Sequence, residues 1–320
     1  MTSNKKYIFS VIVLFISLLL VIEVALRANH FTFNVPFFDE DIPFLYREIN
    51  QEAGIFQFDP ILFWKFTRCS KWNDIKINSL GFRDNEFSVN KGDLFRVIIL
   101  GDSCTAGFES SLPDTYPKQL ERLLNQGSSA KHYQVINAGI PGYTSLQGLR
   151  YSRVLIKEYK PDFIVVYLGI NDGEGARYAD KDLTLRVLMK QLILRNVCLR
   201  SKLAQFILSK VYKYRESGGE YKARVSSDDS KLNLEEIKIL GAQNNIKVLF
   251  LSPCFKHELE RGVHDNRYVS PDPNLDFFNI FQDYKDRLEL VFVDRKHFTV
   301  LGNRLIAESI YKWLIDSNTI

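Results

Sequence analysis

Four short polar segments of this 320-residue sequence carry side chains that could together perform acyl transfer. They are Gly101-Asp102-Ser103, the glycine-rich stretch from Asn137 to Gly142, Gly169-Ile170-Asn171-Asp172 and Asp294-Arg295-Lys296-His297. A serine hydroxyl becomes an effective nucleophile when an adjacent base removes its proton. We expect His297 to be that base for Ser103, and Asp294 to hold the imidazole in the required tautomer.

Acyl transfer also needs hydrogen-bond donors for the oxyanion of the tetrahedral intermediate. The sequence offers the backbone N–H groups of Ser103 and Gly139 and the side-chain amide of Asn171. Because Gly139 has no Cβ, we expect its backbone to approach a ligand closely. Asp102 is expected to hydrogen-bond the turn around the serine, and Asp172 to cap the next helix.

Each polar segment follows a short apolar run that is typical of a strand buried on both faces. We predict strands at Phe95–Leu100, Tyr133–Ile136, Phe163–Leu168, Lys247–Leu251 and Leu290–Val293. Helical patterns lie at Tyr116–Leu124, Leu146–Tyr159, Leu232–Gln243 and Leu301–Leu314. This alternation indicates a parallel sheet with helices on both faces. In such open α/β sheets, ligands bind beyond the carboxyl ends of the strands. The four segments are therefore expected on one rim.

In this order, the four segments resemble the motif blocks of the SGNH (GDSL-type) hydrolase family. The four residues of the family's name match Ser103, Gly139, Asn171 and His297, and the resemblance covers about residues 94–316. It implies a three-layer α/β/α, flavodoxin-like fold with a five-stranded parallel sheet. It also implies hydrolysis of esters, often acyl groups on carbohydrates or lipids, without a metal or organic cofactor.

The N-terminus carries an apolar segment long enough to cross a bilayer. Residues 7–22 include no charge, and the run continues past Glu23 for about three residues. About twenty residues at 1.5 Å each span roughly 30 Å. Lys5 and Lys6 precede the run and favour a cytoplasmic N-terminus, which would place the rest of the chain outside. A cleaved signal peptide is the alternative, but small residues are poorly placed for cleavage, so we predict an uncleaved anchor.

Three parts are expected along the chain: a membrane anchor over 1–28, an irregular, β-rich extension over 29–93 packed on the domain, and the hydrolase domain over 94–320. The segment Asn78–Asp84 of the extension resembles one that precedes the catalytic domain in membrane-tethered bacterial members of the family. We expect it to form a structural hairpin.

A helical insertion is expected near residues 184–216 of the hydrolase domain. Residues 184–215 carry eight basic and no acidic side chains, with apolar residues mostly three or four apart. This pattern indicates a basic amphipathic helix that either caps the site and touches anionic headgroups or packs on the sheet with solvated charges. The polar stretch Ser217–Ser230 is expected to be an exposed loop.

Composition narrows the possible functions. A net charge of +4, from 42 basic and 38 acidic residues, excludes a strongly basic nucleic-acid-binding protein. The cysteines, at positions 69, 104, 198 and 254, form no C-x-x-C pair, which disfavours a zinc site or a dense disulfide framework. Isolated thiols are favoured, and one or two disulfides stay open.

We therefore predict a single-pass membrane protein whose serine esterase domain lies in the periplasm or outside the cell. Its substrate would be an acylated carbohydrate of the envelope or an exported one, or a lipid. An O-acyltransferase is an alternative, because a sugar hydroxyl can resolve the same acyl-enzyme. A non-catalytic envelope binding protein is a further alternative, which the complete set of four site positions disfavours.

Overall fold

The computed structural model describes residues 3–31, 54–126, 132–176, 178–183, 200–215, 222–264 and 270–320. The chain divides into two compact units. The first unit combines Met1–Pro43 with Leu183–Tyr221, and the second unit combines Phe44–Asp182 with Lys222–Ile320. The insertion therefore groups with the N-terminal segment, whereas the extension from residue 44 onward shares one unit with the hydrolase segment.

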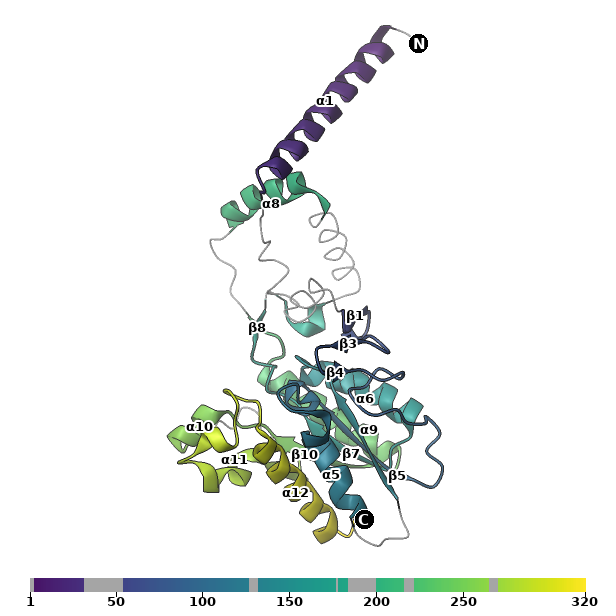
Figure 1. Ribbon diagram of the computed structural model, residues 1–320, viewed down its shortest axis with the longest axis vertical. Coiled ribbons are helices and arrows are strands. Elements are labelled where there is room, and N and C mark those ends of the chain that lie inside the picture. The colour runs from purple at the N-terminus through teal and green to yellow at the C-terminus, as the bar shows by residue number, and fades with distance from the viewer. Residues whose placement is uncertain are drawn as a thin grey trace. The chain divides into compact units, whose positions relative to one another are not determined.

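A five-stranded parallel sheet forms the centre of the second unit (Figure 1). Its strands are β5 (Phe95–Gly101), β6 (Tyr133–Gly139), β7 (Phe163–Tyr167), β10 (Lys247–Ser252) and β11 (Asn274–Asp276). The spatial order is β6-β5-β7-β10-β11. In chain order this is 2-1-3-4-5, the flavodoxin-like arrangement, and its topological switch point lies between β5 and β7.

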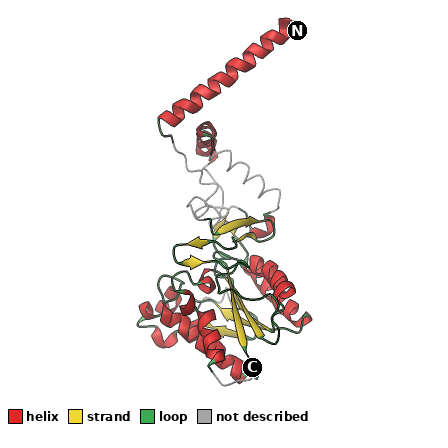
Figure 2. Cartoon of the chain, turned by 45° about the vertical axis from the view of Figure 1, so that its right-hand side comes forward, coloured by secondary structure: helices red, strands yellow, loops and turns green. Residues whose placement is uncertain are grey.

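Helices cover both faces of the sheet and complete three layers (Figure 2). The helix α5 (Tyr116–Asn125) packs against α12 (Val300–Asp316), and α6 (Ser145–Tyr159) packs against α9 (Ser227–Gln243). The chain crosses from β5 to β6 and from β6 to β7 in opposite directions. Because such crossovers are right-handed, α5 and α6 lie on opposite faces. The expected α/β/α fold with a parallel sheet is confirmed.

The fifth strand differs from the prediction. Instead of a strand at Leu290–Val293, the structure has a short 3₁₀ turn, η5 (Leu288–Leu290), followed by a single bridge between Phe292 and Phe298. Val291 and Phe292 are buried in the core, whereas Leu290 and Val293 are exposed, and the run does not join the sheet. The edge strand β11 reads Asn-Leu-Asp, which carries no apolar pattern by which it could be found.

The second unit also contains small hairpins outside the main sheet. In the extension, β1 (Phe56–Asp59) pairs with β2 (Phe63–Phe66), and β3 (Lys71–Trp72) pairs with β4 (Ile75–Lys76). On either side of the insertion, β8 (Gly175–Ala176) pairs with β9 (Lys222–Ala223), so the two segments that flank the insertion lie side by side. The expected loop at Ser217–Ser230 is wrong from Ser227 onward, where α9 begins behind its Ser226 cap.

Two helices are described in the first unit, α1 (Ser3–Ala28) and α8 (Lys202–Arg215). Lys5–Ala28 is the candidate membrane span among the described residues, by length and composition. The α8 helix agrees with the helical pattern expected for the insertion. The part of that pattern between residues 184 and 199 lies outside the described residues.

Candidate active site

Ser103 lies where the carboxyl end of β5 turns into the one-turn helix α4 (Ser103–Ala106). Asp102 caps this helix, because its Oδ1 accepts the Cys104 N–H at 2.9 Å. The expected hydrogen bond between Asp102 and the turn around Ser103 is therefore confirmed. Burial raises the pKa of Asp102, and the nearby charge of Lys296 opposes this shift.

His297 and Asp294 lie on the loop before α12 and complete a continuous hydrogen-bonded chain with the serine. His297 Nε2 is 2.9 Å from Ser103 Oγ, and His297 Nδ1 is 2.7 Å from Asp294 Oδ2. Partial burial raises the pKa of Asp294, but hydrogen bonds from the Lys296 N–H and from His297 outweigh this effect and lower the pKa to about 2. An ionised carboxylate only accepts, so Nδ1 carries the ring proton and Nε2 accepts the serine hydroxyl.

Asn171 follows β7 on the other side of the switch point and is fully hydrogen-bonded. Its Nδ2 donates to Asp102 Oδ2 at 2.8 Å and to the Tyr143 carbonyl at 3.0 Å. Its Oδ1 accepts from Lys296 Nζ at 2.8 Å. Asn171 therefore lies beside the nucleophile turn, as expected, but an oxyanion would have to replace one of its two acceptors.

Gly139 does not fit the expected donor role. Its N–H already donates to Asn137 Oδ1 at 3.0 Å, and Asn137 Nδ2 donates to the Thr105 carbonyl. A Cβ on Gly139 would lie 2.3 Å from the Ala106 nitrogen. The close approach predicted for this glycine is thus made to α4 and not to a ligand.

The turn from Ile140 to Tyr143 lies next to Asn171 and is held from outside the sheet. The Tyr143 N–H donates to the Ile140 carbonyl at 3.2 Å, and Gly142 has a φ of +76°. Proline followed by glycine at the two central positions is typical of a type II turn. Trp64 Nε1 donates to the Pro141 carbonyl at 3.0 Å.

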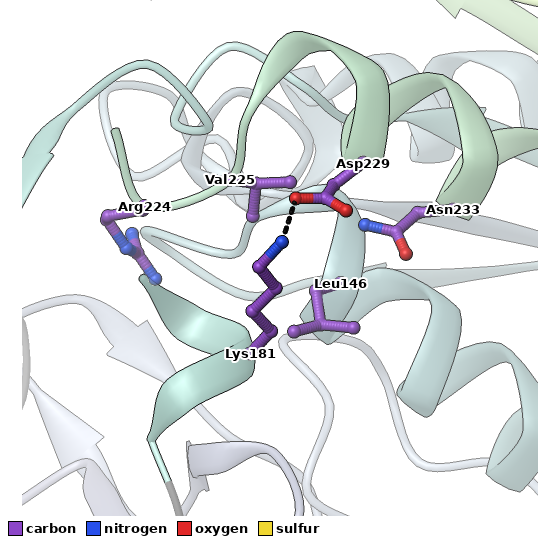
Figure 3. Close-up of a pocket in the computed structure, with 6 residues that line it drawn as sticks. All are labelled: Leu146, Lys181, Arg224, Val225, Asp229 and Asn233. Atoms are coloured by element: carbon purple, nitrogen blue, oxygen red, sulfur yellow. Dashed lines mark hydrogen bonds and ion pairs between the residues drawn. The ribbon is translucent and has the colours of Figure 1, made fainter. Parts of the chain in front are cut away.

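Arg224 supports the same turn from the base of the insertion. Its Nη1 donates to the Gly142 carbonyl at 2.7 Å, and its Nη2 forms a buried ion pair with Asp180 at 3.1 Å. The cavity beside Arg224 holds about 50 Å³ and is bridged by the ion pair between Lys181 and Asp229 (Figure 3). This volume accommodates one or two water molecules and is too small for an ester substrate.

The segment Asn78–Asp84 is a loop of turns and bends and not the expected hairpin; within it the Asn78 N–H donates to the Phe82 carbonyl at 2.9 Å. Arg83 is 3% exposed and donates to the carbonyls of Ala106 and Gly107, and to that of Ser110 at 2.6 Å. Asp84 Oδ2 accepts the Asn137 N–H at 2.9 Å. The extension thus holds the end of the nucleophile helix. The sequence marked the segment, but nothing in it indicated these partners.

Asp172 and the cysteines take structural positions. Asp172 Oδ1 accepts the Ser145 N–H at 2.8 Å, so it caps the preceding helix α6 and not the next one. Burial raises its pKa to about 6. Cys104 is buried, its Sγ faces the Lys296 carbonyl, and burial raises its thiol pKa. Cys69, Cys104 and Cys254 are free thiols, and position 198 lies outside the described residues.

Comparisons with known proteins identify the family of this chain. Residues 99–305 match the GDSL-like Lipase/Acylhydrolase family. The Escherichia coli (strain K12) protein named thioesterase 1/protease 1/lysophospholipase L1 is 30% identical over 176 residues, which cover 55% of this chain and 77% of that protein. The arylesterase of Vibrio mimicus is 34% identical over 79 residues, which cover 24% of this chain and 38% of that protein.

A solved lipase/acylhydrolase from Enterococcus faecalis aligns with 69% of this chain and 95% of its own, with a TM-score of 0.45 and 20% identity. The family match takes up more than half of the chain and contains Ser103, Asn171, Asp294 and His297. The chain is therefore a member of the GDSL-like lipase/acylhydrolase family of ester-hydrolysing enzymes.

Proposed function

We propose that this protein is a membrane-tethered serine esterase that cleaves acyl esters through an acyl-enzyme on Ser103. The hydrogen-bonded chain from Ser103 through His297 to Asp294 is the observation that carries the proposal. A nucleophile, a base and a group that orients the base are the minimum that this chemistry requires.

In the first half-reaction, His297 Nε2 takes the Ser103 proton as Oγ attacks the acyl carbon. The bond to the leaving oxygen then breaks, and His297 returns the proton to that oxygen. In the second half-reaction, His297 deprotonates a water that attacks the acyl-Ser103 ester and releases the acid. Asp294, ionised at neutral pH because of its low pKa, stabilises the imidazolium in both halves.

The oxyanion would be held by the Ser103 N–H and the Asn171 amide, with the Gly142 N–H in place of that of Gly139. In a type II turn the N–H of the third residue takes no part in the turn's own hydrogen bond, and here that residue is Gly142. The turn lies beside Asn171, which donates to the Tyr143 carbonyl. Asn171 would exchange that carbonyl for the oxyanion.

The proposed substrates are acyl esters of an envelope or exported carbohydrate, or of a lipid, outside the cytoplasm. Two observations support this range. In α1, Lys5 and Lys6 precede the uncharged run of residues 7–22 and favour a cytoplasmic N-terminus. The relatives carry names that refer to thioesters, lysophospholipids and aryl esters, so the shared site accommodates different leaving groups.

Purified full-length protein in detergent tests the mechanism with nitrophenyl esters from acetate to palmitate and with a fluorophosphonate label. We expect Ser103→Ala to abolish both turnover and labelling. Ser111→Ala, which changes a nearby exposed serine, should leave both unchanged. Normal hydrolysis by Ser103→Ala would overturn the assignment. Acyl release that depends on an added glycan would identify a transferase.

A further inference from the structure

Glu23 is an anomaly in the apolar helix α1. It lies between Ile22 and Val24, near the end of the candidate span. A carboxylate at the edge of a bilayer is costly unless it is paired, so an ionisable residue there calls for a named partner. The first unit supplies that partner from a segment that follows about 180 residues later in the chain.

The partner is the start of α8. Glu23 Oε1 accepts the Lys202 N–H at 3.0 Å, and Oε2 accepts the Leu203 N–H at 2.7 Å and the Ser201 hydroxyl at 3.0 Å. Arg27 pairs with the same carboxylate at 2.7 Å. Glu23 thus satisfies N–H groups that have no partner within the helix, and its charge complements the α8 dipole.

Two further contacts fix α8 to the end of α1, as the arrangement of the two helices in Figures 1 and 2 also shows. Arg27 Nη2 donates to the Arg200 carbonyl at 2.6 Å. The rings of Phe31 and Phe206 meet edge to face, with their centres 5.7 Å apart. A signal peptide removed after residue 25 or 28 would take Glu23 away from α8. These contacts therefore favour an anchor that is retained.

The composition of α8 fits a membrane surface. Residues 200–215 include five basic and no acidic side chains. Ile207 is 53% exposed and Lys210 is also exposed, so the helix offers both apolar and cationic groups to its surroundings. A helix fixed at the end of a bilayer-length span lies at the level of the headgroups, where each basic residue contributes about 1 kcal/mol of attraction to anionic lipid.

We propose that α8 is a membrane-surface helix, docked on the retained anchor through Glu23, and that its partner is the anionic headgroup layer. The proposal rests on the membrane tethering proposed above and is independent of the esterase mechanism.

Hydrogen exchange of the full-length protein in nanodiscs tests the lipid contact. We expect slower exchange over 200–215 in phosphatidylcholine mixed with phosphatidylglycerol than in phosphatidylcholine alone, and a smaller difference at high salt. The double variant Lys202→Gln/Lys210→Gln should lose the difference. The control Lys231→Gln/Lys285→Gln, which removes two exposed cations elsewhere, should keep it. Equal exchange in both lipids would overturn the proposal.

Glu23→Leu tests the docking, because it lengthens the apolar span while removing the cap. We expect the amides of residues 201–203 to exchange at least about five-fold faster, the effect of losing a helix cap of ordinary strength. Glu86→Leu is the matched control, since Glu86 also accepts from an N–H and a hydroxyl, both of Ser79. Unchanged exchange in Glu23→Leu, or an intact mass that shows cleavage before residue 31, would contradict the docking.

Turnover of a water-soluble ester, measured in the same nanodisc samples, separates the two proposals. If α8 shows no lipid dependence while Ser103-dependent turnover persists, only the surface role fails. If the turnover is independent of Ser103, the proposed esterase mechanism fails whatever α8 does.

Discussion

Lys296 lies between Asp294 and His297 in the sequence. Unlike the Asp294 side chain, its side chain is almost fully buried. Its Nζ is 2.8 Å from Asn171 Oδ1 and 3.6 Å from Glu174, and its side chain is 10% exposed. Its charge opposes the rise that burial causes in the pKa of Asp102. Lys296 therefore orients the Asn171 amide and compensates the buried charge behind the nucleophile.

Lys296→Met is expected to lower kcat about 10- to 100-fold with little change in KM, because a hydrogen bond to a charged group contributes about 1.5–3 kcal/mol. Steady-state kinetics on a short nitrophenyl ester measure this effect. Arg295→Met is the matched control: it removes the same charge one residue away, from a side chain that is 70% exposed. Equal losses in the two variants would indicate a long-range charge effect and not an oriented amide.

The sequence alone identified the four candidate residues Ser103, His297, Asp294 and Asn171, because few residue types perform acyl transfer and all four follow strands or apolar runs. Lys296 was not identified, since a lysine inside an Asp-x-x-His loop ordinarily indicates a solvated side chain. Gly139 was assigned the wrong task for a related reason. A glycine at position 139 indicates that the backbone is closely approached, but the sequence does not show whether a ligand or a helix approaches it.

At the scale of elements, β6 and α4 are in contact through Gly139. Gly139→Ala would push a Cβ against the Ala106 nitrogen and the Thr105 carbonyl carbon, which are backbone atoms that no rotamer change can move. We expect a loss of about 1–3 kcal/mol in the free energy of unfolding, together with loss of turnover. Gly54→Ala, with its nearest neighbour 4.0 Å away, is the control. An active, stable Gly139→Ala protein would show that this contact is loose.

The extension also holds the C-terminal end of α4, through Arg83. Arg83→Met should lower kcat and the rate of fluorophosphonate labelling by about tenfold or more, since two buried carbonyls and one part-buried carbonyl lose this donor. KM for a small ester should change little, because the substituted side chain lies behind the helix. Arg68→Met, in the same extension but exposed, is the comparison. A change confined to the melting temperature would reduce Arg83 to a purely structural role.

Of the elements that position the site, the long apolar strands could be predicted from the sequence, and the short strands could not. The strands β5, β6, β7 and β10 have apolar runs that period and length identify, whereas β11 is three residues long and polar at both ends. The hairpins of the extension and the β8–β9 pair depend on partners distant in sequence. Periodicity describes a segment alone, so such pairings are invisible to it.

At the scale of the whole second unit, Asp172 couples stability to pH. Burial raises its folded-state pKa to about 6 from 3.8, so the folded state holds the extra proton between these values. The stability that the protonated Asp172 carboxyl contributes to the fold is thus fully present below pH 3.8 and is lost as pH rises through 6. Two pKa units correspond to at most about 3 kcal/mol.

We therefore expect the melting temperature of the wild-type protein to fall relative to that of Asp172→Asn as pH rises from 4 to 7. Asparagine can still accept the Ser145 N–H, so the cap of α6 is kept. Asp182→Asn, an exposed acid in the same unit, should track the wild-type protein. Parallel curves for wild type and Asp172→Asn would show that this carboxyl titrates normally.

The bond between Glu23 and the start of α8 also has a consequence for biogenesis. The two partners are synthesised about 180 residues apart. In the membrane-tethered protein proposed above, synthesis at roughly 5–20 residues per second would bring α1 into the membrane some 10–40 s before α8 exists. During that interval Glu23 has Arg27 as a partner within its own helix but lacks the α8 amides. The proposed anchor would therefore be held least firmly in the bilayer early in translation, and synthesis of the insertion would supply its remaining contacts.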